Sequence, residues 1–124
     1  MKNQSLVELS QNTGVFLVSA KELKNLADFN SVNFESDWVL VDFWATWCGP
    51  CQSMLPVFDK IADSFNSQLS AVKVDVDQLQ SFAVSHGVRG VPTLMLFHKG
   101  KPVDRLVGAQ PEGQVSKWLS GHLA

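Results

Sequence analysis

The sequence lacks the features that would link the chain to a membrane or to nucleic acid. No apolar run approaches the roughly twenty residues that a membrane-spanning helix needs. The formal net charge is −2 and charged residues make up 18% of the chain, which is too little basic charge for nucleic-acid binding and too little net charge for disorder. We therefore expect a globular protein with no membrane or nucleic-acid partner. We also expect a monomer.

The first residues do not have the pattern of a secretory leader. Lys2 is followed by a polar segment, and the apolar run at residues 15–18 is shorter than the roughly seven to fifteen residues of a leader's apolar core. A chain of 124 residues has the length of one domain. We expect a cytoplasmic chain with a loosely held extension over residues 1–14 and a single domain over residues 15–124.

Cysteine is scarce, because Cys48 and Cys51 are the only two in the chain. A domain of this length does not need cross-links to hold its core, so the pair indicates a catalytic or regulatory role. A C-x-x-C pair between a strand and a helix is typical of a redox dithiol. The alternative is half of a zinc site, which requires two further ligands. The three histidines, His86, His98 and His122, lie far apart in the sequence, which disfavours zinc.

The segments on either side of the pair have clear patterns. Residues 38–45 are apolar at nearly every position, which predicts a strand covered on both faces. After Cys51, apolar residues recur at spacings of three and four, which predicts a helix with Pro50 in its first turn and a kink at Pro56. Cys48 then lies at the helix N-terminus, where backbone amides favour a thiolate, and Cys51 lies one turn further in and more buried.

The remaining patterns predict a mixed α/β fold. We expect a strand at residues 15–18 and a helix opened by a capping box, Ser19 to Glu22. A strand at residues 71–76 precedes a short helix that begins with a cap at Asp77 and ends near His86. A hairpin of residues 93–98 and 101–107 leads to a final helix with Pro111 in its first turn.

This order, β-α-β-α-β-α-β-β-α, predicts a mixed central sheet with helices on both faces. The cysteine pair then falls at the carboxyl end of the central strand, where open α/β sheets usually place their chemistry.

Two charged residues interrupt the expected strands. Asp42 shares a face with Leu40 and Trp44, where burial should raise its pKa and allow it to exchange a proton near neutral pH. The alternative is a structural acid paired with a lysine or with backbone amides. Lys73 is predicted to face the same side as Asp42, and its alternative is an ordinary solvated strand lysine.

Several motifs, in this order along the chain, closely resemble the thioredoxin family. They are Val41-Asp42-Phe43-Trp44-Ala45, Trp47-Cys48-Gly49-Pro50-Cys51, Gly90-Val91-Pro92-Thr93 and Gly108. The resemblance runs from about residue 15 to the C-terminus and implies the thioredoxin fold. It also implies a dithiol electron carrier without a bound cofactor, which reduces disulfides in client proteins. Its electrons would come from NADPH through a flavin-dependent thioredoxin reductase.

The resemblance gives each matching residue an expected role. Cys48 would attack a client disulfide, and Cys51 would resolve the mixed disulfide. Asp42 would take the proton of Cys51, with Lys73 near its carboxylate. Residues that would modulate the dithiol are Trp47, Gly49, Pro50 and Pro92, the last matching the family's cis-proline. The client peptide would lie in a groove lined by Trp47, Gly90, Val91, Pro92, Val107, Gly108 and Ala109.

One position departs from the family pattern, because Gln52 follows Cys51 where the family commonly has lysine. The missing charge weakens any expected attraction to acidic partners and leaves the nucleophile intact. Two other functions remain possible for this sequence. One is a thiol oxidase or isomerase, which Gly49-Pro50 disfavours, and the other is a binding subunit without redox turnover, which the intact cysteine pair disfavours.

Overall fold

The computed structural model describes residues 21–23 and 37–123 of the chain. The elements in order are β1 (Lys21–Leu23), β2 (Trp38–Trp44), α1 (Gly49–Ser64), β3 (Ser70–Asp75), α2 (Gln80–Ser85), β4 (Thr93–His98), β5 (Lys101–Val107) and α3 (Glu112–Leu123). The expected strand at residues 15–18 and the expected extension over residues 1–14 lie outside the described residues.

The five described strands form one mixed sheet with β2 at its centre. Their order across the sheet is β1-β3-β2-β4-β5. β2 is parallel to β3 and antiparallel to β4, and β5 pairs antiparallel with β4 as the second arm of the predicted hairpin. Because β4 runs against β2, the end of β2 lies beside the start of β4, where Phe43 is paired with Thr93.

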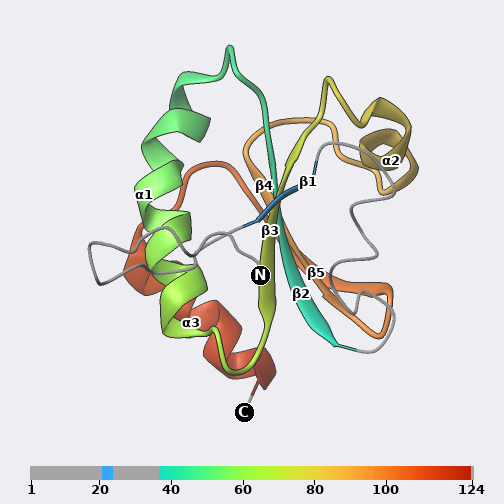
Figure 1. Ribbon diagram of the computed structural model, residues 1–124. Coiled ribbons are helices and arrows are strands. Elements are labelled where there is room, and N and C mark those ends of the chain that lie inside the picture. The colour runs from blue at the N-terminus through green and yellow to red at the C-terminus, as the bar shows by residue number, and fades with distance from the viewer. Residues whose placement is uncertain (1–20, 24–36, 124) are drawn as a thin grey trace, which may run out of the picture.

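Helices cover both faces of the sheet, as predicted. α1 and α3 lie on one side and α2 on the other (Figure 1). Alternate residues of β2 divide between the two layers, because successive strand side chains point to opposite faces. Leu40 packs with Phe58 of α1 and Leu119 of α3, whereas Val41 and Phe43 belong to the core beneath α2. The predicted central strand and the helix that follows the cysteines are therefore confirmed.

The predicted capping box at Ser19 to Glu22 is wrong for the part that the structure describes. Lys21–Leu23 is not the start of a helix but strand β1, which pairs in parallel with Val72–Val74 of β3. A capping motif is a local signal, and pairing with the edge of a sheet overrides it. The rest of the expected first helix lies among residues that the structure does not describe.

The predicted cap at Asp77 is also wrong. α2 begins after Leu79, which makes no side-chain capping hydrogen bond, and the Asp77 carboxylate accepts a hydrogen bond from Trp47 instead. The other end of α2 agrees with the sequence, because His86 is its C-terminal cap and Gly87 follows with a φ of 73°. In the described part of the chain, no helix is both long and apolar enough to cross a membrane.

The packing of α1 on the sheet should provide much of the stability. Phe58 is fully buried between the sheet and α3, so Phe58→Ala should lower the free energy of unfolding by about 3 to 5 kcal/mol. Urea denaturation followed by circular dichroism measures this change. Lys60→Ala is the matched control on the same helix, because its exposed ion pair with Glu112, at 3.9 Å, should contribute no more than about 1 kcal/mol. Equal losses in the two variants would contradict this account of the core.

Candidate functional site

The two cysteines form a disulfide at the junction of β2 and α1. Cys48 is the N-terminal cap of α1, and Gly49 and Pro50 are its first helical residues. Proline suits this place because its missing amide hydrogen would have no partner within the helix anyway. The Cα atoms of Cys48 and Cys51 lie 5.3 Å apart, and the side chains are 5% and 0% exposed. Cys51 is thus the more buried of the two, as predicted.

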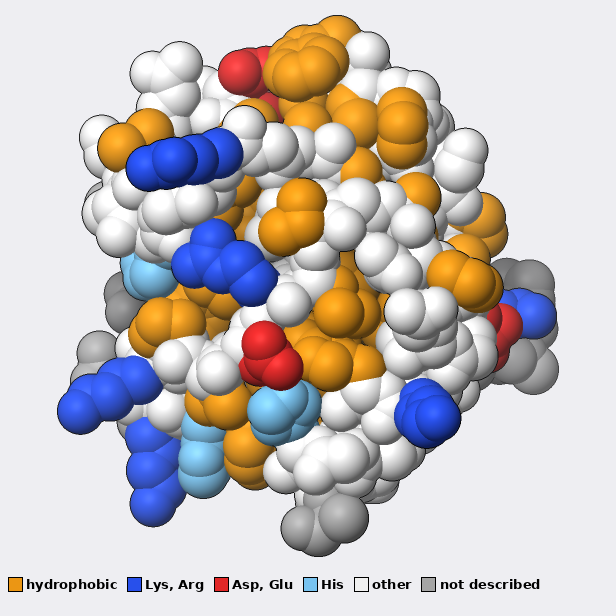
Figure 2. Space-filling model, turned by 180° about the vertical axis from the view of Figure 1, so that it is seen from behind, with side chains coloured by type: hydrophobic (Ala, Val, Ile, Leu, Met, Phe, Trp, Pro, Cys, Tyr) orange, Lys and Arg blue, Asp and Glu red, His pale blue; other side chains and the backbone are white. Residues whose placement is uncertain are grey.

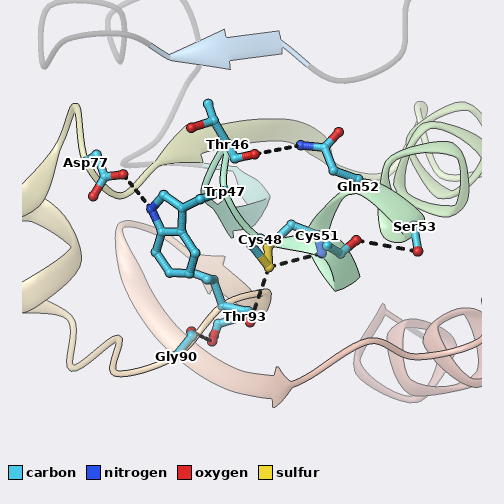
Figure 3. The surroundings of a disulfide bond; sticks show 11 residues. Thr46, Trp47, Cys48, Cys51, Gln52, Ser53, Asp77, Gly90 and Thr93 are labelled. Atoms are coloured by element: carbon cyan, nitrogen blue, oxygen red, sulfur yellow. Dashed lines mark hydrogen bonds between the residues drawn. A yellow bond between two sulfur atoms is a disulfide. The ribbon is translucent and has the colours of Figure 1, made fainter.

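The Cys48 sulfur lies where an anion is stabilised. Its Sγ accepts a hydrogen bond of 3.1 Å from the backbone N–H of Cys51 (Figure 3). Sγ also lies 3.7 Å from the carbonyl oxygen of Val91, to which only the reduced thiol has a proton to donate. When the disulfide is opened, the amide and the N-terminus of α1 both favour Cys48 as a thiolate, which is the form that attacks disulfides.

The segment before β4 lies beside the disulfide, where Val91 packs against the two cysteines, because β4 starts where β2 ends. The peptide bond between Val91 and Pro92 is cis, which agrees with the resemblance of this residue to the family's cis-proline. The turn before β4 is closed by a hydrogen bond of 2.7 Å from the Thr93 hydroxyl to the carbonyl oxygen of Gly90. A further bond of 2.8 Å joins the N–H of Gly108 to the carbonyl oxygen of Pro92. Segments far apart in the sequence thereby meet at one edge of the sheet.

The surface around the disulfide is largely apolar and accessible. Trp47 is 69% exposed and Val107 is 62% exposed. Hydrophobic side chains gather on the surface at the top of Figure 2, the end of the molecule at which the loop between β2 and α1 lies in Figure 1. A hollow of about 170 Å³ beside the disulfide is lined by Trp47, Val76, Val88, Arg89, Gly90 and Val91.

Most of the predicted groove residues thus share one edge of the molecule. Trp47, Gly90 and Val91 line the hollow, and Gly108 is bonded to Pro92, with Val107 and Ala109 on either side of it in the chain. The sequence did not indicate Val76, Val88 or Arg89. A signal was available for Val76, because it directly follows β3, and parallel strands β2 and β3 end at the same edge.

Asp77 is a site residue that the sequence did not reveal. Its Oδ2 accepts a hydrogen bond of 2.9 Å from the indole Nε1 of Trp47, which holds an otherwise exposed ring beside the disulfide (Figure 3). The Asp77 backbone N–H in turn donates to the carboxylate of Asp75, at 2.8 Å. Gln52, the departure from the family pattern, is exposed and its side-chain amide donates to the carbonyl oxygen of Thr46 at 3.5 Å.

Asp42 is a fully buried acid on β2, the strand that leads to the disulfide. Its side chain is 0% exposed, and no hydrogen-bond partner among the described residues reaches either carboxylate oxygen. An ionised carboxylate without partners is strongly disfavoured in such surroundings. Desolvation therefore raises the pKa of Asp42 from 3.8 to about 7, and the nearby carboxylates of Glu22 and Asp59 contribute to the increase. The Lys73 ammonium opposes this shift and lowers the pKa.

The strand register explains why Lys73 acts on Asp42. The two residues are direct partners across the parallel pair of β2 and β3, so their side chains leave the sheet on the same face. Lys73 is half-buried rather than fully solvated. The prediction that Lys73 faces the same side of the sheet as Asp42 is therefore confirmed. Near pH 7, the Asp42 carboxyl can both hold and release a proton.

The raised pKa should make stability depend on pH. Between pH 3.8 and about pH 7, the folded protein keeps a proton on Asp42 that the unfolded chain has released. The free energy of unfolding should therefore fall as the pH rises through this window, by roughly 4 kcal/mol in total. Asp42→Asn removes the titration and should be more stable than the wild type at pH 8, as measured by urea denaturation at several pH values.

The exposed Asp37 provides the matched control for this experiment. Asp37→Asn should keep the pH dependence of the wild type, because its side chain loses little solvation on folding. An Asp42→Asn variant with the same slope as the wild type would show that the buried carboxyl does not titrate in this window.

Comparisons with known proteins agree with the geometry. A family model for thioredoxin matches residues 20–121. The chain is 48% identical over 85 residues to thioredoxin 1 of Synechococcus elongatus, across 68% of this chain and 79% of that relative. It is 44% identical over 97 residues to thioredoxin of Staphylococcus aureus, across 78% and 92% of the two chains.

Solved structures give the same result. A point mutant of thioredoxin from Halobacterium salinarum superposes with a TM-score of 0.77 at 36% identity, covering 86% of this chain and 92% of that chain. Thioredoxin of Malassezia sympodialis superposes with a TM-score of 0.76 at 35% identity, covering 90% and 99%. With its Cys48–Cys51 disulfide at the start of α1, the chain belongs to the thioredoxin family of thiol–disulfide oxidoreductases.

Proposed function

We propose that the chain is a cytoplasmic, monomeric dithiol carrier that reduces disulfides in client proteins and is reduced again by a flavin-dependent, NADPH-driven thioredoxin reductase. The observation that carries this proposal is the Cys48–Cys51 disulfide, with Cys48 at a helix N-terminus beside an accessible apolar surface. Such a surface suits an extended peptide, because backbone hydrogen bonds hold the chain and apolar contacts tolerate varied side chains. The NADPH and the flavin belong to the reductase.

In the first step, the Cys48 thiolate attacks one sulfur of the client disulfide. The client S–S bond breaks, a mixed disulfide forms on Cys48, and one client thiolate leaves and takes a proton from water. The N–H of Cys51 and the N-terminus of α1 favour the attacking anion. Trp47, held by Asp77, and the segment at Pro92 flank the client peptide during this step.

In the second step, Cys51 resolves the mixed disulfide. Its thiol gives a proton to the Asp42 carboxylate, directly or through water, and the Cys51 thiolate attacks the sulfur of Cys48. The Cys48–Cys51 disulfide forms, the second client thiolate leaves, and two electrons have passed to the client. A carboxyl with a pKa of about 7 suits this exchange, because it is neither fully protonated nor fully ionised near neutral pH.

Insulin reduction tests the reductase function. The wild type should reduce insulin with NADPH and a thioredoxin reductase, and Cys48→Ser should abolish turnover because the nucleophile is lost. Ser53→Ala, an exposed position on the same helix, is the control and should retain activity. Insulin reduction by Cys48→Ser at the wild-type rate would exclude this mechanism. An active wild type that accepts electrons from glutathione but not from the reductase would exclude the proposed electron source.

Trapping tests the order of the two cysteines. In Cys51→Ser the mixed disulfide on Cys48 has no internal thiol to resolve it, so covalent adducts with oxidised client proteins should accumulate. Non-reducing gels and mass spectrometry measure the adducts. A trap that stays empty while Cys48→Ser forms adducts would reverse the two roles.

The exposed indole at the site offers a test of client binding. Trp47→Ala removes a side chain that is 69% exposed and contributes little to the core, so it should raise the KM for insulin several-fold and leave stability nearly unchanged. Val84→Ala is the matched control, because Val84 is 72% exposed on α2 and is not among the residues that line the hollow. Equal KM values for wild type and Trp47→Ala would remove Trp47 from the client surface.

A further inference from the structure

Three charged residues form a row across the sheet on the face that carries Asp42. Glu22 of β1 is the direct partner of Lys73 of β3, and Lys73 is the direct partner of Asp42 of β2. Both pairings are parallel, and neighbouring strands lie about 4.8 Å apart, so laterally paired side chains leave the same face side by side. The row is therefore acid, base, acid, with Lys73 on the strand between the two acidic residues.

Burial increases along this row from the edge of the sheet to its centre. Glu22 and Lys73 are half-buried, whereas Asp42 is fully buried. On the other side of Asp42, its partner on β4 is the apolar Leu94. Above this face, α3 contributes Val115 and Leu119 to the apolar core, and α1 contributes the carboxylate of Asp59, which also acts on Asp42. Among the described residues, Lys73 is the one cation that lowers the pKa of Asp42.

We propose that Glu22 is a positioning residue for the second step of the reaction, because it draws the Lys73 ammonium partly away from Asp42. This inference rests on the proposed function, since it concerns the proton that Asp42 receives from Cys51. If the Lys73 ammonium interacted with the Asp42 carboxylate alone, it would keep that carboxylate ionised and make it a weak base. Glu22 on the far side of Lys73 gives the ammonium a second anion, which leaves Asp42 more basic.

The direction of the effect follows from the charges. Ionised Glu22 raises the pKa of Asp42 by direct repulsion. In the proposed arrangement it also weakens the opposing effect of Lys73. Glu22→Gln removes both contributions while keeping the shape of the side chain. The pKa of Asp42 should then fall, so the carboxyl should lose its proton at a lower pH in the variant.

The experiment is a pH titration of the Asp42 carboxyl carbon by NMR in the reduced, full-length protein. Glu22→Gln should lower the midpoint by about half a pH unit, and the pH profile of single-turnover disulfide reduction should move in the same direction. Glu22→Asp, which restores the carboxylate, should bring the midpoint back toward the wild type. Glu112→Gln is the matched control, because this carboxylate on α3 pairs with Lys60 and is not among the groups that act on Asp42.

A variant without the Lys73 ammonium distinguishes two ways in which Glu22 can act on Asp42. Glu22 can attract the Lys73 ammonium, or it can simply repel the Asp42 carboxylate. In Lys73→Met, Glu22→Gln should shift the midpoint by less than half of its shift in the wild type, because there is no ammonium left to share. An equal shift in both backgrounds, or an unchanged midpoint in Glu22→Gln alone, would overturn the proposal. Insulin reduction by the wild type keeps the two hypotheses apart: its absence would refute the reductase function, whereas a normal rate with an unchanged midpoint would refute only the role of Glu22.

Discussion

The pairing of β2 with its two neighbours is the constraint on which the site depends. Its antiparallel pairing with β4 brings Cys48 to Val91, a separation of 43 residues, and its parallel pairing with β3 sets Asp42 beside Lys73. Every residue from Val39 to Phe43 is fully buried, so a shift of register by one residue would exchange the two faces of the strand and place Asp42 in the core beneath α2. The backbone hydrogen bonds that join β2 to β3 and β4 thus determine both the packing of the sheet and the positions of the residues around the dithiol.

The site combines exposed apolar side chains at the surface with buried groups that take part in the proposed chemistry. At the surface, Trp47, Val76 and Val91 contribute to an accessible, largely apolar rim, which is the proposed contact surface for a client peptide. Below it, Cys51 and Asp42 are shielded from water, which is why a carboxyl can hold a proton near neutral pH. Burying this acid lowers the stability of the folded state at a pH where the unfolded chain would ionise it. The same burial gives the carboxyl the raised pKa that the proposed proton transfer uses.

Sequence reasoning succeeded where many residues carry the same signal. β2 is apolar along its whole length apart from Asp42, and α1 repeats its apolar face over several turns, so both were predicted with the cysteines in their correct places. It failed where a short local motif competed with distant contacts. Lys21–Leu23 has a helix-start pattern but pairs with β3, and Asp77 resembles a cap but binds the indole of Trp47. The hollow beside Trp47 was not predicted as a unit, because Val76 and Val88 meet only after the chain has folded.

The strand at the outer edge, β5, bears on how the protein behaves at high concentration. An open strand edge invites pairing with other chains, which leads to aggregation. Here Pro102 withholds one backbone donor, exposed Lys101, Asp104 and Arg105 add charge, and the pairing of β4 with β5 is irregular near Leu96 and Phe97. The β5 edge is therefore a poor template for another strand, and on this side the sheet can keep an apolar rim at one end without pairing with a second chain.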